Sequence, residues 1–223
     1  MNTLIIDRSS VRPRLALFSH EQLICQHQWT GEPTRAPEWL AELGSLLAQH
    51  NIPLDSIERY ICGLGPGSFS GIRACLAAIL GLALPTKTPV YGVASAAAIA
   101  YALPDASVTV VGDARRNRLW CVSYRKEKET GRLCLANGST PTHTADDFQL
   151  VEASSLATLI PEGARVVSTD WERLEAVLSS ACEAALLIHH PVTVTAEAIG
   201  RLALSDPKAL KLEPSPIYLH PAV

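Results

Sequence analysis

The segment from Gly63 to Leu84, GLGPGSFSGIRACLAAILGLAL, constrains the fold of this chain most strongly. A short apolar run at residues 60–62 leads into a glycine-rich turn, and a helix follows in which Arg73 is the only charged residue. Glycines are expected where the backbone needs positive φ or where another group approaches closely. Ser68 is placed to cap the helix, whose free amides would suit an anion. The segment therefore predicts a strand, a tightly packed turn and a buried helix.

The helix is apolar on all sides. At about 100° per residue, its bulky side chains fall on one broad face and its small ones on the opposite face. The small face comprises Gly71, Ala74, Cys75, Ala78 and Gly81. Such a helix must be buried on both sides, either as a central core helix or as an interface helix that a second helix approaches closely. Composition alone leaves both interpretations open.

A second helix with a patch of small residues is expected at 37–50. Its apolar stripe runs through Trp39, Leu43 and Leu47, and Gly44 and Ala48 lie beside that stripe. We expect the helices at 37–50 and 70–84 to lie side by side and to offer their small residues to a partner helix pair. The predicted interface comprises Gly44, Ala48, Gly71, Ala74, Cys75, Ala78 and Gly81. The same patch on two copies would make a self-complementary, two-fold contact.

The glycine-rich turn matches no common nucleotide motif. Ser68 stands where G-x-G-x-x-G needs its third glycine, and no Gly-Lys-Ser/Thr follows. The string GPGSFSGIR closely resembles GPGSFTGLR, the signature of the TsaB (YeaZ) family of bacterial tRNA threonylcarbamoyladenosine synthesis, and differs only at Ser70 and Ile72. Chain length and the order of elements also fit that family. The signature loop would comprise Gly65, Pro66, Gly67, Ser68, Gly71 and Arg73.

The chain repeats a motif in its two halves. In LIID-RSSVRP-RLALF and VVGD-ARRN-RLWCVSY, a β-run ends in Asp, a polar turn follows, and Arg-Leu opens the next strand. Each half continues with a third strand and then with alternating helices and strands, which indicates two related α/β domains. In the second half the expected elements are a helix near 154–159, a strand at 165–168, a helix at 171–182, a strand at 186–189 and a helix at 195–204.

This layout is similar to that of the actin-like (ASKHA, ribonuclease H-like) superfamily, to which the TsaB family belongs. The sequence predicts an amino-terminal lobe at 1–104 that carries the interface helices and a carboxy-terminal lobe at 105–191. The remaining segment, 192–223, is expected to form a helix and a tail that pack back on the first lobe.

Composition limits the partners and the compartment. The chain has 223 residues, is 48% hydrophobic and carries a net charge of −3, which gives no global attraction to nucleic acid. The basic segment 115–128 is read first as a solvated hairpin and second as a site of tRNA contact. The amino terminus lacks the basic and long apolar regions of a signal peptide, and Arg73 and Pro85 interrupt the best candidate for a membrane span. We expect a cytoplasmic protein.

The cysteines are scattered, with no C-x-x-C pair, at positions 25, 62, 75, 121, 134 and 182. Because most have apolar neighbours, they are expected to be separate, buried and free of disulfides.

Two turns are the candidates for nucleotide contacts. Asp7 and Asp113 each end a β-run, and in the actin-like superfamily such turns hold phosphates while an acidic residue orients a metal or water. The resemblance thus makes Asp7, Ser9, Ser10 and Asp113 the candidate nucleotide-binding residues. The alternative is that Asp ends these strands because its side chain caps the turn. Arg8 stands where the family's D-T-S motif has Thr, so any ATP or ADP with Mg²⁺ would bind weakly, and no cofactor is required.

No catalytic or metal-binding set is found in the sequence. The histidines have no H-x-x-x-H spacing, which a zinc protease would need and which the related TsaD subunit uses for its metal. Ser68 and Ser70 both fail the G-x-S-x-G spacing of a nucleophile elbow. The sequence predicts neither a protease nor a serine hydrolase.

The resemblance implies a non-catalytic partner subunit in the synthesis of threonylcarbamoyladenosine beside the tRNA anticodon. Such a subunit would dimerise with a TsaD-like catalytic subunit, work with a TsaE-like ATPase, form a homodimer when alone, and meet tRNA only within the complex. One alternative is a small actin-like ATPase or kinase that uses Asp7 and Asp113 with magnesium. Another is a free-standing homodimer with a chaperone-like or regulatory role.

Overall fold

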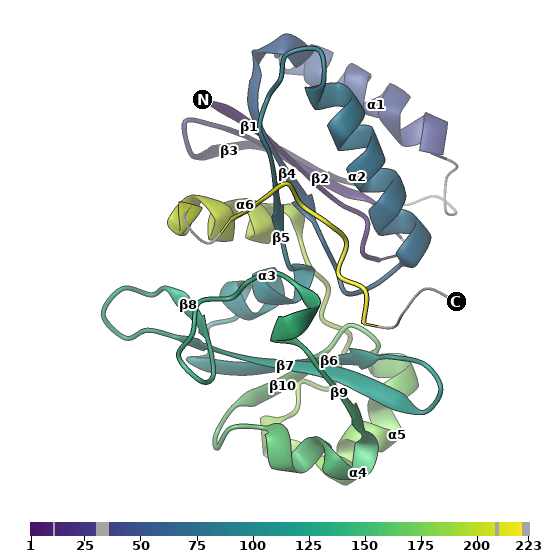
Figure 1. The fold of residues 1–223 in the computed structure, drawn as a ribbon, viewed down its shortest axis with the longest axis vertical. Helices are drawn as coiled ribbons and strands as arrows, with labels where there is room; N and C mark the ends of the chain where they lie inside the picture. Colours follow the sequence, from purple (N-terminus) through teal and green to yellow (C-terminus); the bar gives the residue numbers. More distant parts are fainter. Residues whose placement is uncertain (11, 30–35, 208–209, 220–223) are drawn as a thin grey trace. The chain divides into compact units, whose positions relative to one another are not determined.

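The computed structural model describes residues 1–10, 12–29, 36–207 and 210–219. Its strands are β1 (Asn2–Asp7), β2 (Arg14–Ser19), β3 (Gln22–Gln28), β4 (Ile57–Gly63), β5 (Val90–Val93), β6 (Ser107–Asp113), β7 (Arg118–Lys126), β8 (Leu133–Leu135), β9 (Gln149–Glu152), β10 (Arg165–Ser168) and β11 (Lys211–Leu212). Its α-helices are α1 (Ala36–Gln49), α2 (Phe69–Ala83), α3 (Ser95–Ala102), α4 (Ala153–Leu156), α5 (Trp171–Ala181) and α6 (Ala196–Ser205) (Figure 1). Short 3-10 helices are η1 (Leu54–Ser56), η2 (Ala145–Asp147), η3 (Ala157–Leu159) and η4 (Ala184–Leu186).

The chain divides into two compact units. The first unit contains Met1–Ser95 and Thr195–Pro216, and the second contains Ala96–Val194 and Ile217–Val223. The sequence places the boundary at 104/105, whereas the contacts divide the chain after Ser95, so α3 falls almost entirely in the second unit. Within the predicted segment 192–223, α6 packs on β1, β2 and β4 of the first unit. Residues 208–209 and 220–223 of that segment lie outside the described residues.

The first unit is built on a six-stranded mixed sheet in the order β11-β5-β4-β1-β2-β3. The central strand β1 pairs antiparallel with β2 and parallel with β4. Side chains alternate between the two faces of a sheet. Phe18 meets Gly200 of α6, and Cys62 meets Cys75 of α2. Because Phe18 pairs with Thr3 and Cys62 with Ile6, α6 and α2 cover opposite faces of the sheet.

The second unit repeats this arrangement. Strand β6 pairs antiparallel with β7 and parallel with β10, and the order β10-β6-β7-β8 matches β4-β1-β2-β3. Strand β9 also pairs with β7, at the end away from β8. A second hydrophobic core lies between this sheet and α4 and α5, with Leu156, Leu174 and Leu178 buried. The predicted α/β class with two related lobes is confirmed.

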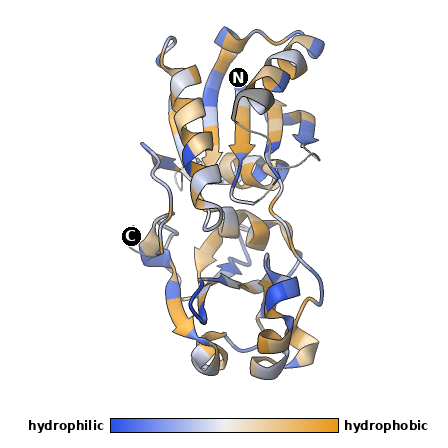
Figure 2. Cartoon of the chain, turned by 90° about the vertical axis from the view of Figure 1, so that its right-hand side faces the viewer, coloured by the Kyte–Doolittle hydropathy of each residue, from blue (hydrophilic) through white to orange (hydrophobic). Residues whose placement is uncertain are grey.

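Local sequence explains where the main helices begin. The Ser68 hydroxyl accepts a hydrogen bond from the Gly71 amide at the start of α2, and the Thr195 hydroxyl does the same for Ala198 in α6. Hydrophobic residues, orange in Figure 2, dominate the inner strands and the helix faces that cover them. None of the helices in the described ranges is both long and apolar enough to cross a membrane.

Two expectations about the second half and the cysteines were wrong. The strand expected at 186–189 is replaced by η4 and a single bridge between Val166 and Leu187. Because Leu187 alone forms a bridge to β10, this segment does not add a strand to the sheet. The six cysteines are free, but Cys25 and Cys182 are only partly buried, and the sulfur atoms of Cys62 and Cys75 lie 3.5 Å apart between β4 and α2.

Candidate functional site

The signature turn sits directly on the turn that follows β1. The Ser68 amide donates a 2.7 Å hydrogen bond to the Ser9 carbonyl. A Cβ added to Gly67 would lie 2.0 Å from that same carbonyl oxygen, and one added to Gly71 would lie 2.4 Å from the Arg8 carbonyl oxygen. These glycines therefore allow the two turns to meet backbone to backbone. At the start of α2, two backbone amides already donate hydrogen bonds within the chain. The Ser68 amide donates to the Ser9 carbonyl, and the Gly71 amide donates to the Ser68 hydroxyl.

Asp7 is the centre of a closed hydrogen-bond network beneath this contact. Its Oδ1 accepts from the Ser9 hydroxyl at 2.8 Å and from the Ser9 amide at 3.2 Å. Its Oδ2 accepts from the Ser95 hydroxyl at 2.7 Å, and the Gly65 amide donates to the Ser95 oxygen at 3.1 Å. Gly63 gives the carboxyl room, since a Cβ there would lie 1.9 Å from Oδ2. Asp7 thus ties the ends of β1 and β4 to the start of α3.

Burial is the largest influence on the pKa of this carboxyl. Asp7 is fully buried, and desolvation raises its pKa above the ordinary value, against the hydrogen bonds from Ser95 and Ser9 and the charge of Arg14. Ser10 is used in a similar way, because its hydroxyl accepts from Arg14 and donates to the Arg12 carbonyl. The structure therefore brings Asp7, Ser9 and Ser10 together, but their side-chain bonds are made within the chain.

Asp113 occupies the corresponding turn of the second unit in a different environment. Its Oδ2 lies 3.2 Å from Nη1 of Arg115 and 3.3 Å from Nη1 of Arg173, and its Oδ1 accepts from the Arg115 amide. The Asp113 amide donates to Asp170, which also pairs with Arg173 and raises the pKa of that arginine. Both oxygens of the Asp113 carboxylate are thus engaged by groups of the same unit, Oδ1 by the Arg115 amide and Oδ2 by the two guanidinium groups. In the described part of the chain, no group of three or more His, Cys, Asp or Glu is arranged to hold a metal.

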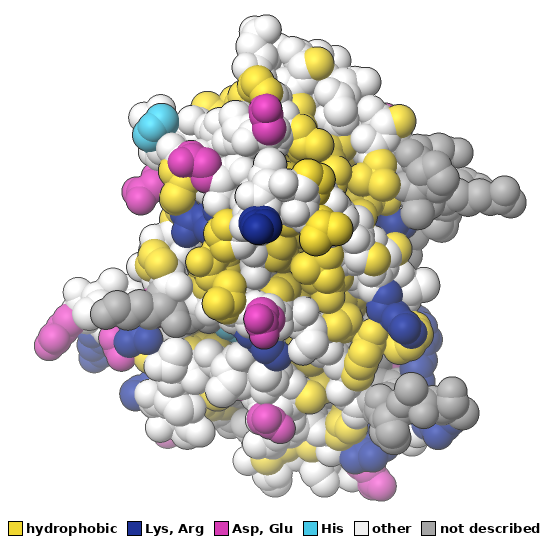
Figure 3. Space-filling model, turned by 45° about the horizontal axis from the view of Figure 1, so that its top comes forward, with side chains coloured by type: hydrophobic (Ala, Val, Ile, Leu, Met, Phe, Trp, Pro, Cys, Tyr) yellow, Lys and Arg dark blue, Asp and Glu magenta, His cyan; other side chains and the backbone are white. Residues whose placement is uncertain are grey.

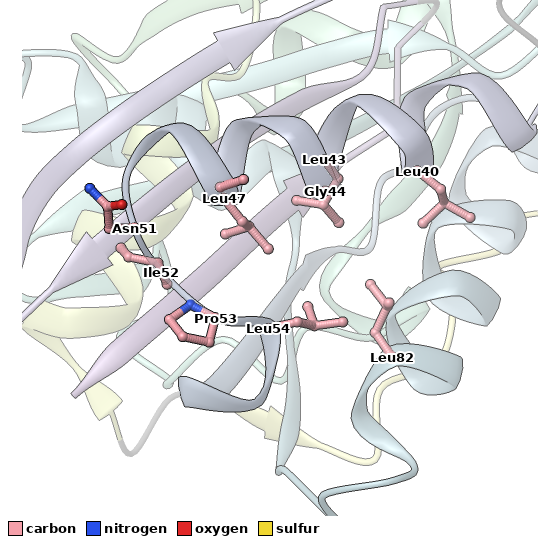
Figure 4. Close-up of a pocket in the computed structure, with 10 residues that line it drawn as sticks. Leu40, Leu43, Gly44, Leu47, Asn51, Ile52, Pro53, Leu54 and Leu82 are labelled. Atoms are coloured by element: carbon pink, nitrogen blue, oxygen red, sulfur yellow. The ribbon is translucent and has the colours of Figure 1, made fainter.

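The first unit has an apolar groove between α1, the segment before β4, and α2. The groove has a volume of about 540 Å³, and Figure 4 shows leucines from both helices along its walls. It is lined by Leu40, Leu43, Gly44, Leu47, Ala48, Asn51, Ile52, Pro53, Leu54 and Leu82. Gly44 forms part of one wall, and a Cβ there would meet nothing within 4 Å. Helices α1 and α2 therefore line one hollow that is open at Gly44.

Large apolar side chains are exposed on the elements that line the groove. Leu54 is 41% exposed, Leu80 of α2 is 47% exposed, and Leu84, directly after α2, is 76% exposed. Figure 3 turns the α1–α2 part of the first unit towards the viewer and shows hydrophobic side chains gathered on this face, with a few charged ones among them. Exposed apolar side chains that gather on one face are typical of a protein–protein contact site.

The predicted interface residues do not all share this surface. Gly44, Ala48 and Gly81 are exposed, and Ala74 and Ala78 are half-buried. Gly71 and Cys75 are instead buried against the turn after β1 and against β4. The difference arises because α2 rests on the sheet through a face that includes small residues. In contrast, Phe69 and Leu80, two bulky residues of the face expected to cover the sheet, are exposed.

Sequence reasoning missed Ser95, Asp170 and Arg173. Ser95 lies 88 positions from Asp7 along the chain, and no local pattern links the two. Asp170 and Arg173 carry a weak signal, since an Asp three residues before an Arg at a helix start favours a local ion pair.

Comparisons with known proteins place this geometry in a family context. Residues 38–212 match the family model of TsaD, described as tRNA N6-adenosine threonylcarbamoyltransferase. The fold is similar to that of an uncharacterized protein with similarity to peptidase YeaZ from Pseudomonas aeruginosa, with a TM-score of 0.78 and 21% identity over 98% of this chain and 99% of that one. It is also similar to YeaZ from Pseudomonas aeruginosa, with a TM-score of 0.74 and 22% identity over 93% of this chain and 94% of that one.

Proposed function

Because the chain belongs to the TsaD family, we propose that it acts in the synthesis of threonylcarbamoyladenosine beside the tRNA anticodon, as a partner subunit and not as the catalytic one. The observation that carries this proposal is the contrast between two surfaces. The α1–α2 groove exposes apolar side chains that none of the described residues covers. The carboxylates of Asp7 and Asp113, in the turns after β1 and β6, are engaged by serines and arginines of the same chain.

The chemistry of the transfer argues for a second subunit. Activation of an acyl group requires an electrophilic centre such as a metal, or a positioned nucleophile and base. The described residues offer no cluster suited to a metal, and the histidines of the sequence lack H-x-x-x-H spacing. The catalytic centre would therefore be supplied by a TsaD-like subunit, and a TsaE-like ATPase would supply the nucleotide chemistry.

The partner proposed for the groove is the matching helix pair of that TsaD-like subunit. A structural relative would present two helices of similar spacing, and the exposed apolar side chains of Leu54, Leu80 and Leu84 would be buried against them. The same surface on a second copy would give a homodimer when the chain is alone. In this proposal the complex is cytoplasmic, tRNA is contacted only within it, and this chain needs no cofactor of its own.

Gly44→Arg tests the proposal in the groove itself. The backbone around Gly44 has open space, so the variant should fold, and an arginine should stabilise a helix interior by about 0.5–1 kcal/mol relative to glycine. A charged side chain in the groove should weaken self-association and capture of the TsaD-like subunit at least tenfold, which corresponds to about 1.4 kcal/mol. Sedimentation measures the first effect and a pull-down measures the second.

The matched control is Ala176→Arg on α5, which adds the same side chain at an exposed helix position of the second unit. It should leave both associations unchanged. If Gly44→Arg binds the TsaD-like subunit as well as Ala176→Arg does, the groove is not the interface. Steady ATP turnover by the isolated chain would instead support the small ATPase or kinase that uses Asp7 and Asp113.

A further inference from the structure

Two cysteine thiols meet in the core of the first unit. Cys62, on β4, and Cys75, on α2, are both fully buried, and their sulfur atoms lie 3.5 Å apart. The Cys75 thiol also donates a weak hydrogen bond of 3.7 Å to the carbonyl oxygen of Ile6, on β1. The two thiols therefore face each other at the place where β1, β4 and α2 meet.

The elements around the pair hold it in this position. Cys62 lies in an inner strand, between Ile6 of β1 and Gly92 of β5. Cys75 lies one turn after Gly71, which packs directly against the backbone of the turn after β1. A disulfide needs its sulfur atoms about 2 Å apart, so the two side chains have to approach by only about 1.5 Å.

Helix α2 is the layer that separates this pair from solvent. On its outer side Arg73, Ala77 and Leu80 are exposed, whereas Cys75 and Ile79 on its inner side are buried. Proteins open locally at a lower cost in free energy than that of complete unfolding. A local opening of α2 would therefore let a small oxidant reach the thiols while the sheet stays folded.

We propose that Cys62 and Cys75 are an oxidative modification site, at which hydrogen peroxide forms a disulfide within the folded chain. In the first step a thiolate of the pair attacks a peroxide oxygen, the O–O bond breaks, and a sulfenic acid and hydroxide result. The hydroxide takes up the proton that the thiol released. In the second step the other thiol attacks the sulfenic sulfur, an S–S bond forms, the S–O bond breaks, and water leaves. Two thiols and one peroxide molecule thus give one disulfide and two water molecules.

The first step should be slow and the second fast. The hydrogen bond with Cys62 and burial raise the pKa of the Cys75 thiol well above its ordinary value, so its thiolate is scarce at neutral pH. Once a sulfenic acid forms, however, the second thiol is already in contact with it. The disulfide should therefore form before another peroxide molecule can oxidise the same sulfur further.

This disulfide would close a loop around the signature loop. Residues 63–74, between the two cysteines, include Gly67 and Gly71, which rest on the turn after β1. A cross-link of this span removes conformational freedom from the unfolded chain. Oxidation should therefore raise the melting temperature by about 5–10 °C, and a thiol reductant should reverse the shift.

Trypsin gives a direct test because it cleaves between the two cysteines, after Arg73. It releases them in separate peptides, 60–73 and 74–87, each with a single cysteine. The reduced full chain is treated with hydrogen peroxide under native conditions, the remaining thiols are alkylated in denaturant, and the digest is analysed by mass spectrometry. We expect the two peptides to be joined, with a mass below their sum by the two hydrogens lost.

Cys121→Ala is the matched control, because it removes a buried thiol of the second unit. It should leave both the cross-link and the rise in melting temperature unchanged, whereas Cys75→Ala should abolish both. The proposal fails if the parent yields the two peptides apart, with alkylated or sulfonated cysteines. It also fails if they are joined only when peroxide is added in urea, because the cross-link then belongs to the unfolded chain. Neither result bears on the α1–α2 groove, whose test measures association of the reduced chain.

Discussion

The two units share a strand order, yet the turn after the first strand is closed by different chemistry in each. In the first unit, Asp7 is fully buried and is held by neutral donors from Ser9 and Ser95. In the second unit, Asp113 is 17% exposed and is held by the charges of Arg115 and Arg173. The first turn is sealed from water by the signature loop, and the second remains at the surface.

The loops that follow the parallel strand account for this difference. After β4, glycines let the backbone at Gly67 and Gly71 rest on the carbonyls of Ser9 and Arg8. After β10, the corresponding loop at 168–170 contains no glycine and uses the Asp170 side chain to reach the Asp113 amide. The turn after the first strand is thus closed in two ways within the same strand order. In the first unit backbone contacts close it, and in the second unit charged side chains close it.

The largest expected effect is that of Gly67→Ala. The new Cβ would lie 2.0 Å from the Ser9 carbonyl oxygen, so the signature loop and the first turn must separate. We expect a loss of about 4 kcal/mol or more in the free energy of unfolding, measured in urea, because such large losses come from disrupted buried contacts. Gly44→Ala is the matched control, with open space around its Cβ, and should stabilise the chain by about 0.5–1 kcal/mol.

The second unit supplies the comparison for that prediction. Thr169→Ala alters an exposed residue of the loop after β10, and its effect should stay within about 0.5 kcal/mol. A loss for Gly67→Ala no larger than that for Thr169→Ala would show that the contact between the two turns is dispensable.

A smaller effect is expected from removing each aspartate. Asp7→Ala leaves the buried hydroxyls of Ser9 and Ser95 without their acceptor, and should cost about 2–4 kcal/mol. Asp113→Ala removes ion pairs with partly exposed arginines, and should cost about 1 kcal/mol or less. The cost of Asp113→Ala should shrink further in 1 M salt, whereas that of Asp7→Ala should not. Equal costs with equal salt dependence would abolish the distinction drawn between the two turns.

Much of the framework could be predicted because its signals are local. The repeated β-Asp-turn-Arg-Leu motif predicted both β1–β2 and β6–β7, and the Ser68 cap fixed the start of α2. The prediction of a strand at 186–189 was wrong because a short apolar run has the same sequence pattern whether or not it pairs with a neighbouring strand. The two short strands β9 and β11 were missed for the converse reason, since their pairing partners decide their structure.

The site was harder to predict because its bonds join distant positions. The sequence marked Asp7, Ser9, Ser10 and Asp113, but the partners that engage them include Ser95 and Arg173, which no spacing rule connects to them. Helical projection also misplaced Gly71 and Cys75, since it cannot tell which side of an all-apolar helix meets the sheet. Tertiary packing settles that choice, and Leu80 and Leu84 are left outside as a result.

A further expected effect is a pH dependence that belongs to the first turn. Burial raises the pKa of Asp7 above its ordinary value of 3.8. Between that value and the raised one, the unfolded chain releases the Asp7 proton while the folded chain still holds it. The contribution of Asp7 to stability is therefore fully present below about pH 4 and is lost as the pH rises through the folded pKa.

Asp7→Asn isolates this contribution, because the amide keeps the shape of the side chain without the titration. The difference in unfolding free energy between the parent and Asp7→Asn should fall as the pH rises from 4, by about 1.4 kcal/mol for each unit by which the folded pKa is raised. Ser95→Ala removes a hydrogen bond that lowers the pKa of Asp7, so it should extend the fall to higher pH. A difference that grows with pH would mean that the serines outweigh burial and hold the carboxylate ionised. Asp7 would then resemble Asp113 as a stabilising anion, and burial of the first turn would no longer separate the two units.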